Sequence, residues 1–420
     1  MSRIQKTVLP VGIKIVTEEM PDVESASIGI WINTGSRNES PAISGISHFI
    51  EHLLFKGTEN RTALDISKEI ESVGGVLNAF TSRESTCFYV KVLSKDLPLA
   101  IDLLSDIFMN SKFDQTEMEK ERQVVLQEIK MVEDTPDDLI HDLFSERFWQ
   151  GGQLGRSILG TAQTVSGIKR PDVIKYFGER YRSTEDVLIT AAGGLKHEKV
   201  TRLLKSRLAR FSGVKRNSAE AKPSSSPGVK LYKKELEQAH LCLGVPAPAQ
   251  AAPQRYTAYL INTILGSGMS SRLFQEIREK RGLAYSVFSY LNLCRDTGSL
   301  VAYAGTSTKD FSNVVKLMLD EFAKLRAGKV TADEFRAAKE QLKGGMLLGF
   351  ETSDARMSKL ARDEVYFGRV VPVKEIIKDI DAVTLKQLVA MASDMLRPEK
   401  VTLVGLGNVT KRGLPDSLKG

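Results

Sequence analysis

The hydrophobic and polar residues of this 420-residue chain follow the same series of patterns in two successive rounds. Each round begins with short apolar or alternating runs, continues with long amphipathic stretches, and closes on a short apolar run that ends in glycine. Alternation with a period of two predicts strands, whereas apolar positions three and four residues apart predict helices. The pattern therefore predicts a duplicated module that contains both kinds of element.

The first round predicts strands and helices in a definite order. The expected strands are 12–16, 25–33, a pair between 76 and 92 around a polar turn, and the closing run 187–194. The expected helices are 45–55, 63–73, 97–110 and 114–132. Asp114 is expected to cap the last of these helices, with Glu117 as its capping-box partner.

The second round follows the same plan. Its expected strands are 229–232, 240–245, 285–290, 299–306 and the closing run 401–407. Its expected helices are 255–265, 271–281, 313–325 and 331–348. We therefore predict an α+β fold with two homologous α/β-sandwich modules, each a mixed, mainly antiparallel sheet packed by helices.

A segment with the composition of a linker, Pro223-Ser-Ser-Ser-Pro-Gly228, separates the two rounds. It divides the chain into an N-terminal module over 1–215, a linker over 216–228 and a C-terminal module over 229–420. A duplicated chain often carries a site between its halves, but the fold alone assigns no chemistry.

The net charge of +7 raises the question of a nucleic-acid partner. Residues 1–228 hold 30 basic and 31 acidic residues, so the whole basic excess lies in the second round. Neither round has a run of five basic residues or a basic stripe interleaved with aromatics. We therefore expect no nucleic-acid partner.

The compartment is predicted from cysteines and from apolar runs. Cys87, Cys242 and Cys294 are far apart and show no CxxC spacing, which argues against a disulfide framework or a thiolate metal site. The first residues lack the apolar core of a signal peptide and the length of a transit peptide. No run of 18 apolar residues is present. We expect a cytoplasmic, bacterial-type protein that does not enter a membrane.

Two of the five histidines lie four residues apart in His48-Phe-Ile-Glu51-His52. On a helix this spacing places both imidazoles on one face, where they can bind one metal ion, and Glu51 next to them can reach a bound water. The order is the inverse of the HExxH zinc-protease helix. The alternative is two ordinary histidines beside a solvated glutamate.

A catalytic zinc ion needs a third protein ligand. The remaining histidines are isolated, so carboxylates are the better candidates, and Glu121 and Glu128 share one face of the helix predicted over 114–132. By these residues alone, a pair of solvated charges on an acidic helix is still the favoured interpretation.

The motif from His48 to His52, followed by Glu128 76 positions later, resembles the pitrilysin/insulinase family of zinc peptidases. The short-chain branch, with the catalytic subunit of the mitochondrial processing peptidase and its bacterial relatives, is the most similar. The resemblance implies a zinc endopeptidase with Zn²⁺ bound by His48, His52 and Glu128. It further implies that Glu51 is the general base and that Glu121 has a supporting catalytic role.

Substrate contacts are also implied by this resemblance. Arg278 and Tyr285, seven residues apart, resemble the family's pair that holds the substrate carbonyl; alone, they would be a solvated helix charge and a strand residue. Leu77 to Thr81 alternates like an edge strand, which can bind an extended peptide through its backbone. The resemblance implies peptide contacts by Asn78, Ala79 and Phe80, although Phe80 could equally be a core aromatic.

The resemblance also bears on assembly. Long members of the family hold four modules and this chain holds two, which implies a homodimer in which Arg278 and Tyr285 act in trans on unfolded peptides or presequence-like segments. The competing hypothesis, from another class, is a non-catalytic assembly subunit similar to the respiratory-complex core proteins. Those proteins share the fold and have usually lost the metal motif, so an intact motif favours the peptidase.

Overall fold

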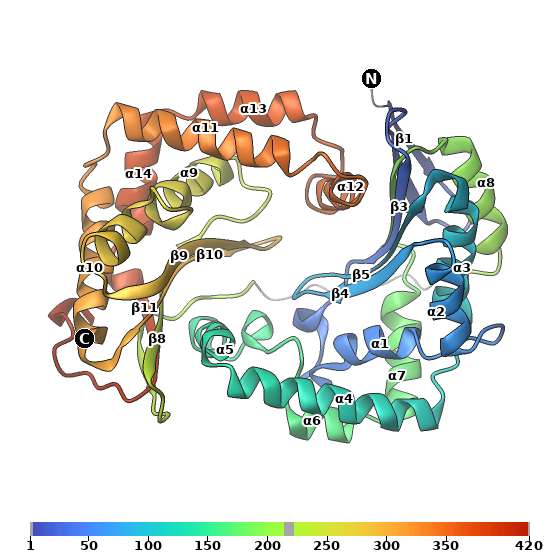
Figure 1. Cartoon of the computed structure of the whole chain (residues 1–420), viewed down its shortest axis with the longest axis horizontal. Helices are drawn as coiled ribbons and strands as arrows, with labels where there is room; N and C mark the ends of the chain where they lie inside the picture. Colours follow the sequence, from blue (N-terminus) through green and yellow to red (C-terminus); the bar gives the residue numbers. More distant parts are fainter. Residues whose placement is uncertain (1–2, 214–221, 419–420) are drawn as a thin grey trace. The chain divides into compact units, whose positions relative to one another are not determined.

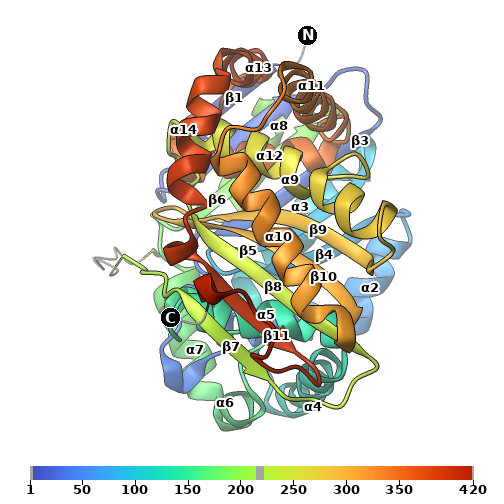
Figure 2. The same cartoon turned by 90° about the vertical axis from the view of Figure 1, so that its left-hand side faces the viewer.

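A computed structural model of the chain describes residues 3–213 and 222–418 (Figures 1 and 2). It divides into two compact units, each with one sheet covered by helices. Unit 1 contains residues 3–130, 156–213 and 349–370, and unit 2 contains residues 131–155, 222–348 and 371–418. Of the linker predicted over 216–228, residues 216–221 lie outside the described residues and 222–228 belong to unit 2.

The sheet of unit 1 has six strands in the order β1-β2-β6-β3-β5-β4. The strands are β1 (Arg3–Val8), β2 (Lys14–Glu19), β3 (Ser25–Ile32), β4 (Val76–Thr81), β5 (Thr86–Leu93) and β6 (Val187–Gly193). β2 and β6 are parallel, and every other neighbouring pair is antiparallel. β4 is therefore an edge strand, as the sequence predicts.

The sheet of unit 2 has five strands in the order β7-β11-β8-β10-β9. They are β7 (Gly228–Tyr232), β8 (Gln238–Ala247), β9 (Ala284–Leu293), β10 (Gly298–Ser307) and β11 (Thr402–Leu406). Only β7 and β11 are parallel. The order and the pairing match those of β2-β6-β3-β5-β4 strand by strand. The predicted fold of two α+β modules with mixed, mainly antiparallel sheets is confirmed.

Helices cover both sheets (Figures 1 and 2). Those of unit 1 are α1 (Ile46–Leu54), α2 (Ala63–Glu71), α3 (Leu97–Asn110), most of α4 (Gln115–Asp134), α6 (Ala162–Gly167), α7 (Arg170–Tyr176), α8 (His197–Arg207) and α12 (Ser353–Phe367). Those of unit 2 are α5 (Pro136–Phe148), α9 (Arg255–Gly266), α10 (Phe311–Arg326), α11 (Ala332–Leu348), α13 (Val373–Ala382) and α14 (Leu385–Met395).

Two helices pack on the sheet of the other half of the chain. α12 comes from the second half, and its Met357 and Leu360 are buried against Trp31 of the first sheet. α5 comes from the first half, and its Phe144 is buried with Val404 of the second sheet. The module boundary at 216–228 stays a prediction. The two compact units do not follow that boundary, because each contains one helix from the other half of the chain.

Most predicted elements lie within a few residues of the observed ones, and the differences are local. The stretch 271–281 does not form a regular α-helix, because residues Phe274–Glu279 form a π-helical turn. Asp114 does cap α4, since its Oδ1 accepts hydrogen bonds from the amides of Thr116 and Glu117. All three cysteines are free thiols. Among the described residues, no helix is long and apolar enough to cross a membrane.

Candidate metal centre

The position of α1 is set at its first turn. Gly45 precedes the helix with a φ of 93°, and a Cβ there would lie 2.5 Å from the carbonyl oxygen of Leu159, so only glycine fits. The Glu39 carboxylate accepts hydrogen bonds from the amides of Gly45 and Ser47 at 2.7 and 2.9 Å. Burial raises the pKa of Glu39 to about 7, although these amides favour the ionised form. Glu39 therefore satisfies two amides that no helical carbonyl can reach.

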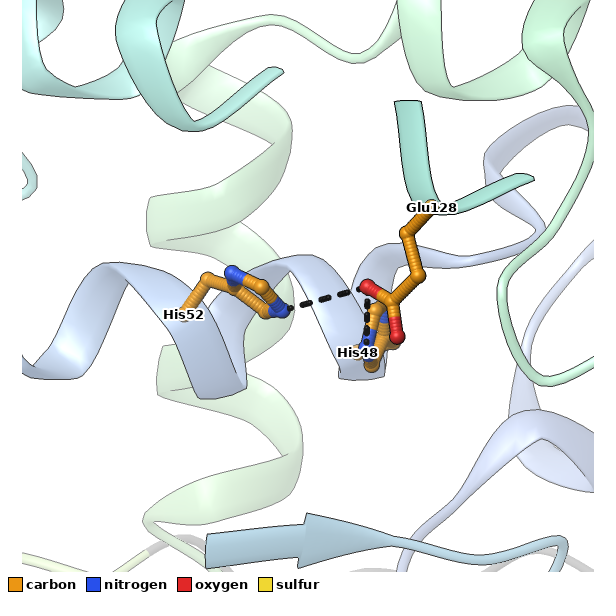
Figure 3. A group of neighbouring side chains, drawn as sticks. All are labelled: His48, His52 and Glu128. Atoms are coloured by element: carbon orange, nitrogen blue, oxygen red, sulfur yellow. Dashed lines mark ion pairs between the residues drawn. The ribbon is translucent and has the colours of Figure 1, made fainter. Parts of the chain in front are cut away.

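One face of α1 is apolar and the other carries the motif. Phe49, Ile50 and Leu53 are fully buried in the core of unit 1. This packing turns His48 and His52 together towards α4, where Glu128 points at both imidazoles (Figure 3). The Nε2 atoms of the two histidines lie 3.6 and 3.7 Å from Oε2 of Glu128.

These separations fit a shared metal ion better than hydrogen bonds. They exceed the usual N–H···O length of about 2.7–3.2 Å. Ligand atoms around a tetrahedral zinc ion with bonds of about 2.1 Å lie about 3.4 Å apart. One ligand atom from each of His48, His52 and Glu128 lies within 4.8 Å of the others, the one such three-residue group of His, Cys, Asp or Glu among the described residues. Two imidazoles and one carboxylate are a donor set that suits Zn²⁺.

His48 is already in the protonation state that a metal needs. Burial and, to a smaller extent, the neighbouring His52 lower the pKa of His48 to about 4. Its imidazole is therefore neutral at pH 7, with a nitrogen lone pair free for a metal ion.

Glu121 lies behind the group rather than in it. The ring N–H at Nδ1 of His52 donates to Oε2 of Glu121 at 3.0 Å, and Lys56 pairs with the other oxygen at 2.8 Å. A carboxylate that accepts from the far nitrogen of a ligand histidine fixes the orientation of the ring. Glu121, for which the sequence predicted only a supporting role, thus has a specific contact: it holds Nε2 of His52 towards Glu128.

Glu51 lies one residue before His52, with one carboxylate oxygen in contact with β4. Thr81, the last residue of that strand, donates a hydrogen bond to Oε2 of Glu51 at 2.5 Å. Burial raises the pKa of Glu51, and the hydrogen bond from Thr81 lowers it in part. A carboxylate with a raised pKa beside residues that can bind a metal ion is suited to general base chemistry.

The residues predicted to contact a peptide lie on the open edge strand β4. Asn78 and Phe80 are exposed, while Ala79 is half-buried on the opposite face. Phe80 is 39% exposed and meets the ring of Trp31 edge-on, so it is not an ordinary core aromatic. The Asn78 side chain accepts from the Ala79 amide at 2.8 Å.

Arg278 and Tyr285 lie together in unit 2. The guanidinium of Arg278 stacks over the ring of Tyr285 and donates to its backbone carbonyl at 2.6 Å. Tyr285 is the second residue of β9, the counterpart of β4, and is 80% exposed. The pair is preformed and its phenol is accessible.

Comparison with known proteins assigns the family. Residues 14–162 match the model of the insulinase family, peptidase family M16, and residues 167–342 match the model named peptidase M16 inactive domain. A protein of Mycobacterium leprae named "uncharacterized zinc protease" is 39% identical over 99% of this chain and 94% of its own. This chain belongs to the insulinase family. The resemblance predicted from the motif is thereby confirmed.

A second relative has the same description, and solved structures have the same fold. A Bacillus subtilis protein with the same description is 38% identical over 91% of this chain and 93% of its own length. The zinc in these names agrees with the predicted cofactor. Two solved structures show the same fold. A Helicobacter pylori protease is 22% identical with a TM-score of 0.89, and the match covers 97% of this chain and 100% of the other. A chain of complex III₂ from Candida albicans is 21% identical with a TM-score of 0.87, and the match covers 99% of this chain and 98% of the other.

The metal centre contains contacts that the sequence did not predict. Glu39, Lys56 and Thr81 each contact α1 or a residue that supports it, yet no pattern in the sequence marks any of them for that role. The one available signal was the alternation of β4, which places Thr81 on the same face as Leu77 and Ala79.

Proposed function

We propose that this member of the insulinase family is a zinc-dependent endopeptidase of the inverted HxxEH type that cuts unfolded peptides or presequence-like segments. The observation that carries the proposal is the convergence of His48, His52 and Glu128, with Glu51 adjacent. In the proposed site, the first three residues hold Zn²⁺. When bound, zinc acts as a Lewis acid and makes a water acidic enough to be deprotonated near neutral pH.

The chain's own residues then move the proton. Glu51 as a carboxylate accepts the proton of the attacking water, and as a carboxylic acid it gives that proton to the leaving amine. Its raised pKa supports both halves of this exchange, because a base with a very low pKa would hold the proton too weakly. Glu121, bound to His52, keeps the ligand ring in place during turnover.

The edge of β4 supports peptide binding in an extended conformation. Hydrogen bonds from a strand edge to a peptide backbone do not depend on the peptide's side chains. We propose that Asn78, Ala79 and Phe80 contact the peptide, since β4 pairs only with β5 among the described strands. This mode of binding favours unfolded segments, because a folded substrate has no free strand to offer.

The test is cleavage of a peptide mixture by protein with a measured zinc content. We expect cuts, mapped by mass spectrometry, that stop when a chelator removes the zinc and return when zinc is added in stoichiometric amount. No cleavage at one zinc per chain across a diverse peptide mixture would remove the peptidase proposal. Such a result would favour the competing hypothesis, a non-catalytic assembly subunit.

The competing hypothesis is supported by the fold alone. A chain of complex III₂ from Candida albicans shares the fold at 21% identity. An assembly subunit has no need for two histidines and a carboxylate that converge on one point beside a carboxylate with a raised pKa. We prefer the peptidase because His48, His52 and Glu128 are all present and converge.

We further propose that two copies of the chain form a homodimer and that Arg278 and Tyr285 bind the substrate carbonyl at the partner's zinc site. A fixed cation and a neutral phenol suit a developing oxyanion. Their mutual stacking supports action as a pair.

Mixing two inactive variants tests action in trans. Glu51→Gln and Arg278→Ala should each be inactive as a pure protein, and a mixture that exchanges subunits should recover up to about a quarter of wild-type turnover per site. In such a mixed dimer one site has both an intact Glu51 and an intact Arg278. Mixtures that form heterodimers by native mass spectrometry yet stay inactive would refute action in trans.

A further inference from the structure

The hydroxyl of Thr81 is the one described group that donates a hydrogen bond to the Glu51 carboxylate. The bond is 2.5 Å long and ends on Oε2, so the other oxygen of Glu51 accepts no hydrogen bond from the described residues. Thirty residues separate the two partners, and the contact joins the edge strand β4 to the helix α1. One oxygen of the proposed base is thus held while the other is left for chemistry.

The turn after β4 fixes the position of Thr81. The amides of Ser36 and Arg37 donate to the carbonyls of Ser82 and Arg83 at 3.2 and 2.9 Å. Gly35 lies so close that a Cβ there would be 2.2 Å from the carbonyl oxygen of Ser82. The strand end is therefore anchored by backbone bonds that do not involve α1.

A second anchor reaches the same turn through Glu84. Its carboxylate pairs with the fully buried Arg37 and accepts a hydrogen bond from the Tyr366 hydroxyl of α12 at 2.9 Å. Breaking a buried ion pair is strongly destabilising. The turn is therefore held from two sides, and the exchanged helix α12 is one of them.

The hydroxyl of Thr86, next to that of Thr81, does not compete with Glu51 for the Thr81 proton. Thr86, opposite Thr81 on β5, donates its own proton to the carbonyl of Thr34 at 3.0 Å and accepts from the Tyr181 hydroxyl at 3.3 Å. A threonine hydroxyl has a single proton. Since Thr81 lies 2.5 Å from Glu51 and 3.5 Å from Thr86, its proton belongs to the shorter bond.

We infer that Thr81 is a positioning residue that orients the Glu51 carboxylate and couples it to β4, the strand proposed to hold the peptide. The inference rests on the proposed function. A peptide that pairs along β4 would lie on the strand whose last side chain holds the base. The same strand thus selects extended substrates and aligns the group that activates the attacking water.

Kinetics of three variants test the inference. Thr81→Val keeps the shape of the side chain but has no proton to donate, and we expect kcat to fall about 10- to 100-fold with KM nearly unchanged, because a misplaced base loses much of its effect. Thr81→Ala should show the same split. Thr81→Ser restores the donor and should keep kcat within about threefold of wild type. Zinc content and melting temperature are measured for each variant, so that a loss of metal or of folding is recognised.

Peptide binding in a Glu51→Gln background separates positioning of the base from a structural role in the strand. We expect Thr81→Val to leave the Kd of a peptide unchanged in this background, because the hydroxyl acts on the base and not on the peptide. A Kd weakened as much as kcat falls, or a failure of Thr81→Ser to restore kcat, would overturn the inference.

The outcomes also separate this inference from the proposed function. Zinc-loaded wild-type protein without turnover removes both. Wild-type turnover together with unchanged kcat in folded, zinc-loaded Thr81→Val removes only the role of Thr81. Turnover in the wild type with the expected split supports both.

Discussion

Replacement of Glu51 by Gln is expected to lower kcat by about 10³-fold or more while one zinc ion per chain is retained. The amide has nearly the shape of the carboxylate but cannot accept a proton, and general base catalysis contributes about 10²–10⁴-fold to a rate. Glu51 is not one of the three residues whose ligand atoms converge, so zinc should stay bound. Peptide turnover, metal analysis and peptide affinity are measured on the same preparations.

A matched control is Glu71→Gln. Glu71 is an exposed residue at the end of α2 in the same unit, and the same chemical change there should leave kcat within about twofold. Turnover of Glu51→Gln close to that of the wild type would show that another group takes the proton. Loss of zinc from this variant would instead place Glu51 among the ligands.

Substitution of the proposed zinc ligands is expected to abolish both zinc binding and turnover. His48→Ala, His52→Ala and Glu128→Ala each leave only two of the three converging donors. We expect zinc content to fall from one per chain to nearly zero after dialysis. Free zinc at 100 times Kd should stabilise the wild type by about 2.7 kcal/mol, and this gain should vanish in the variants.

Glu121→Gln provides an intermediate step in the same series. The side chain touches His52 and Lys56, and loss of such an outer partner typically weakens metal binding about 10–100-fold. Competition with a chelator of known affinity should therefore rank Glu121→Gln between the wild type and the three alanine variants.

His197→Ala controls for the loss of a histidine as such. His197 is buried in unit 1 and bonded to Thr7 and Thr17. Its removal should lower the melting temperature yet leave one zinc per chain with unchanged affinity. Wild-type zinc affinity in Glu128→Ala would contradict the proposed ligand set, as would zinc loss in His197→Ala.

The histidine pair could be predicted from the sequence because the relation between its members is local. Residues four apart on a helix lie on the same face whatever the rest of the fold does. The strand edge at β4 was predicted for a similar reason, since the alternation of Leu77 to Thr81 is a local signal. The proposed third ligand is different, because only the family resemblance separated Glu128 from a solvated glutamate.

Several features needed the tertiary structure. The pairing of Glu121 with His52 spans 69 residues, and the bond from Thr81 to Glu51 depends on how β4 packs beside α1. The position of α12 on the first sheet depends on apolar burial against Trp31, which no local pattern around Leu360 reveals.

The sequence by itself determined the duplicated order of strands and helices and the face of α1 that carries the two histidines, because both follow from the period of the backbone. The family resemblance named Glu128 as the carboxylate partner of that pair, and only the tertiary structure decided how Glu128 faces it, which hydroxyl contacts Glu51, and which sheet each exchanged helix covers. These contacts join residues distant in the chain, and those of the candidate site depend on the apolar faces of α1, α4 and β4 packing in one core.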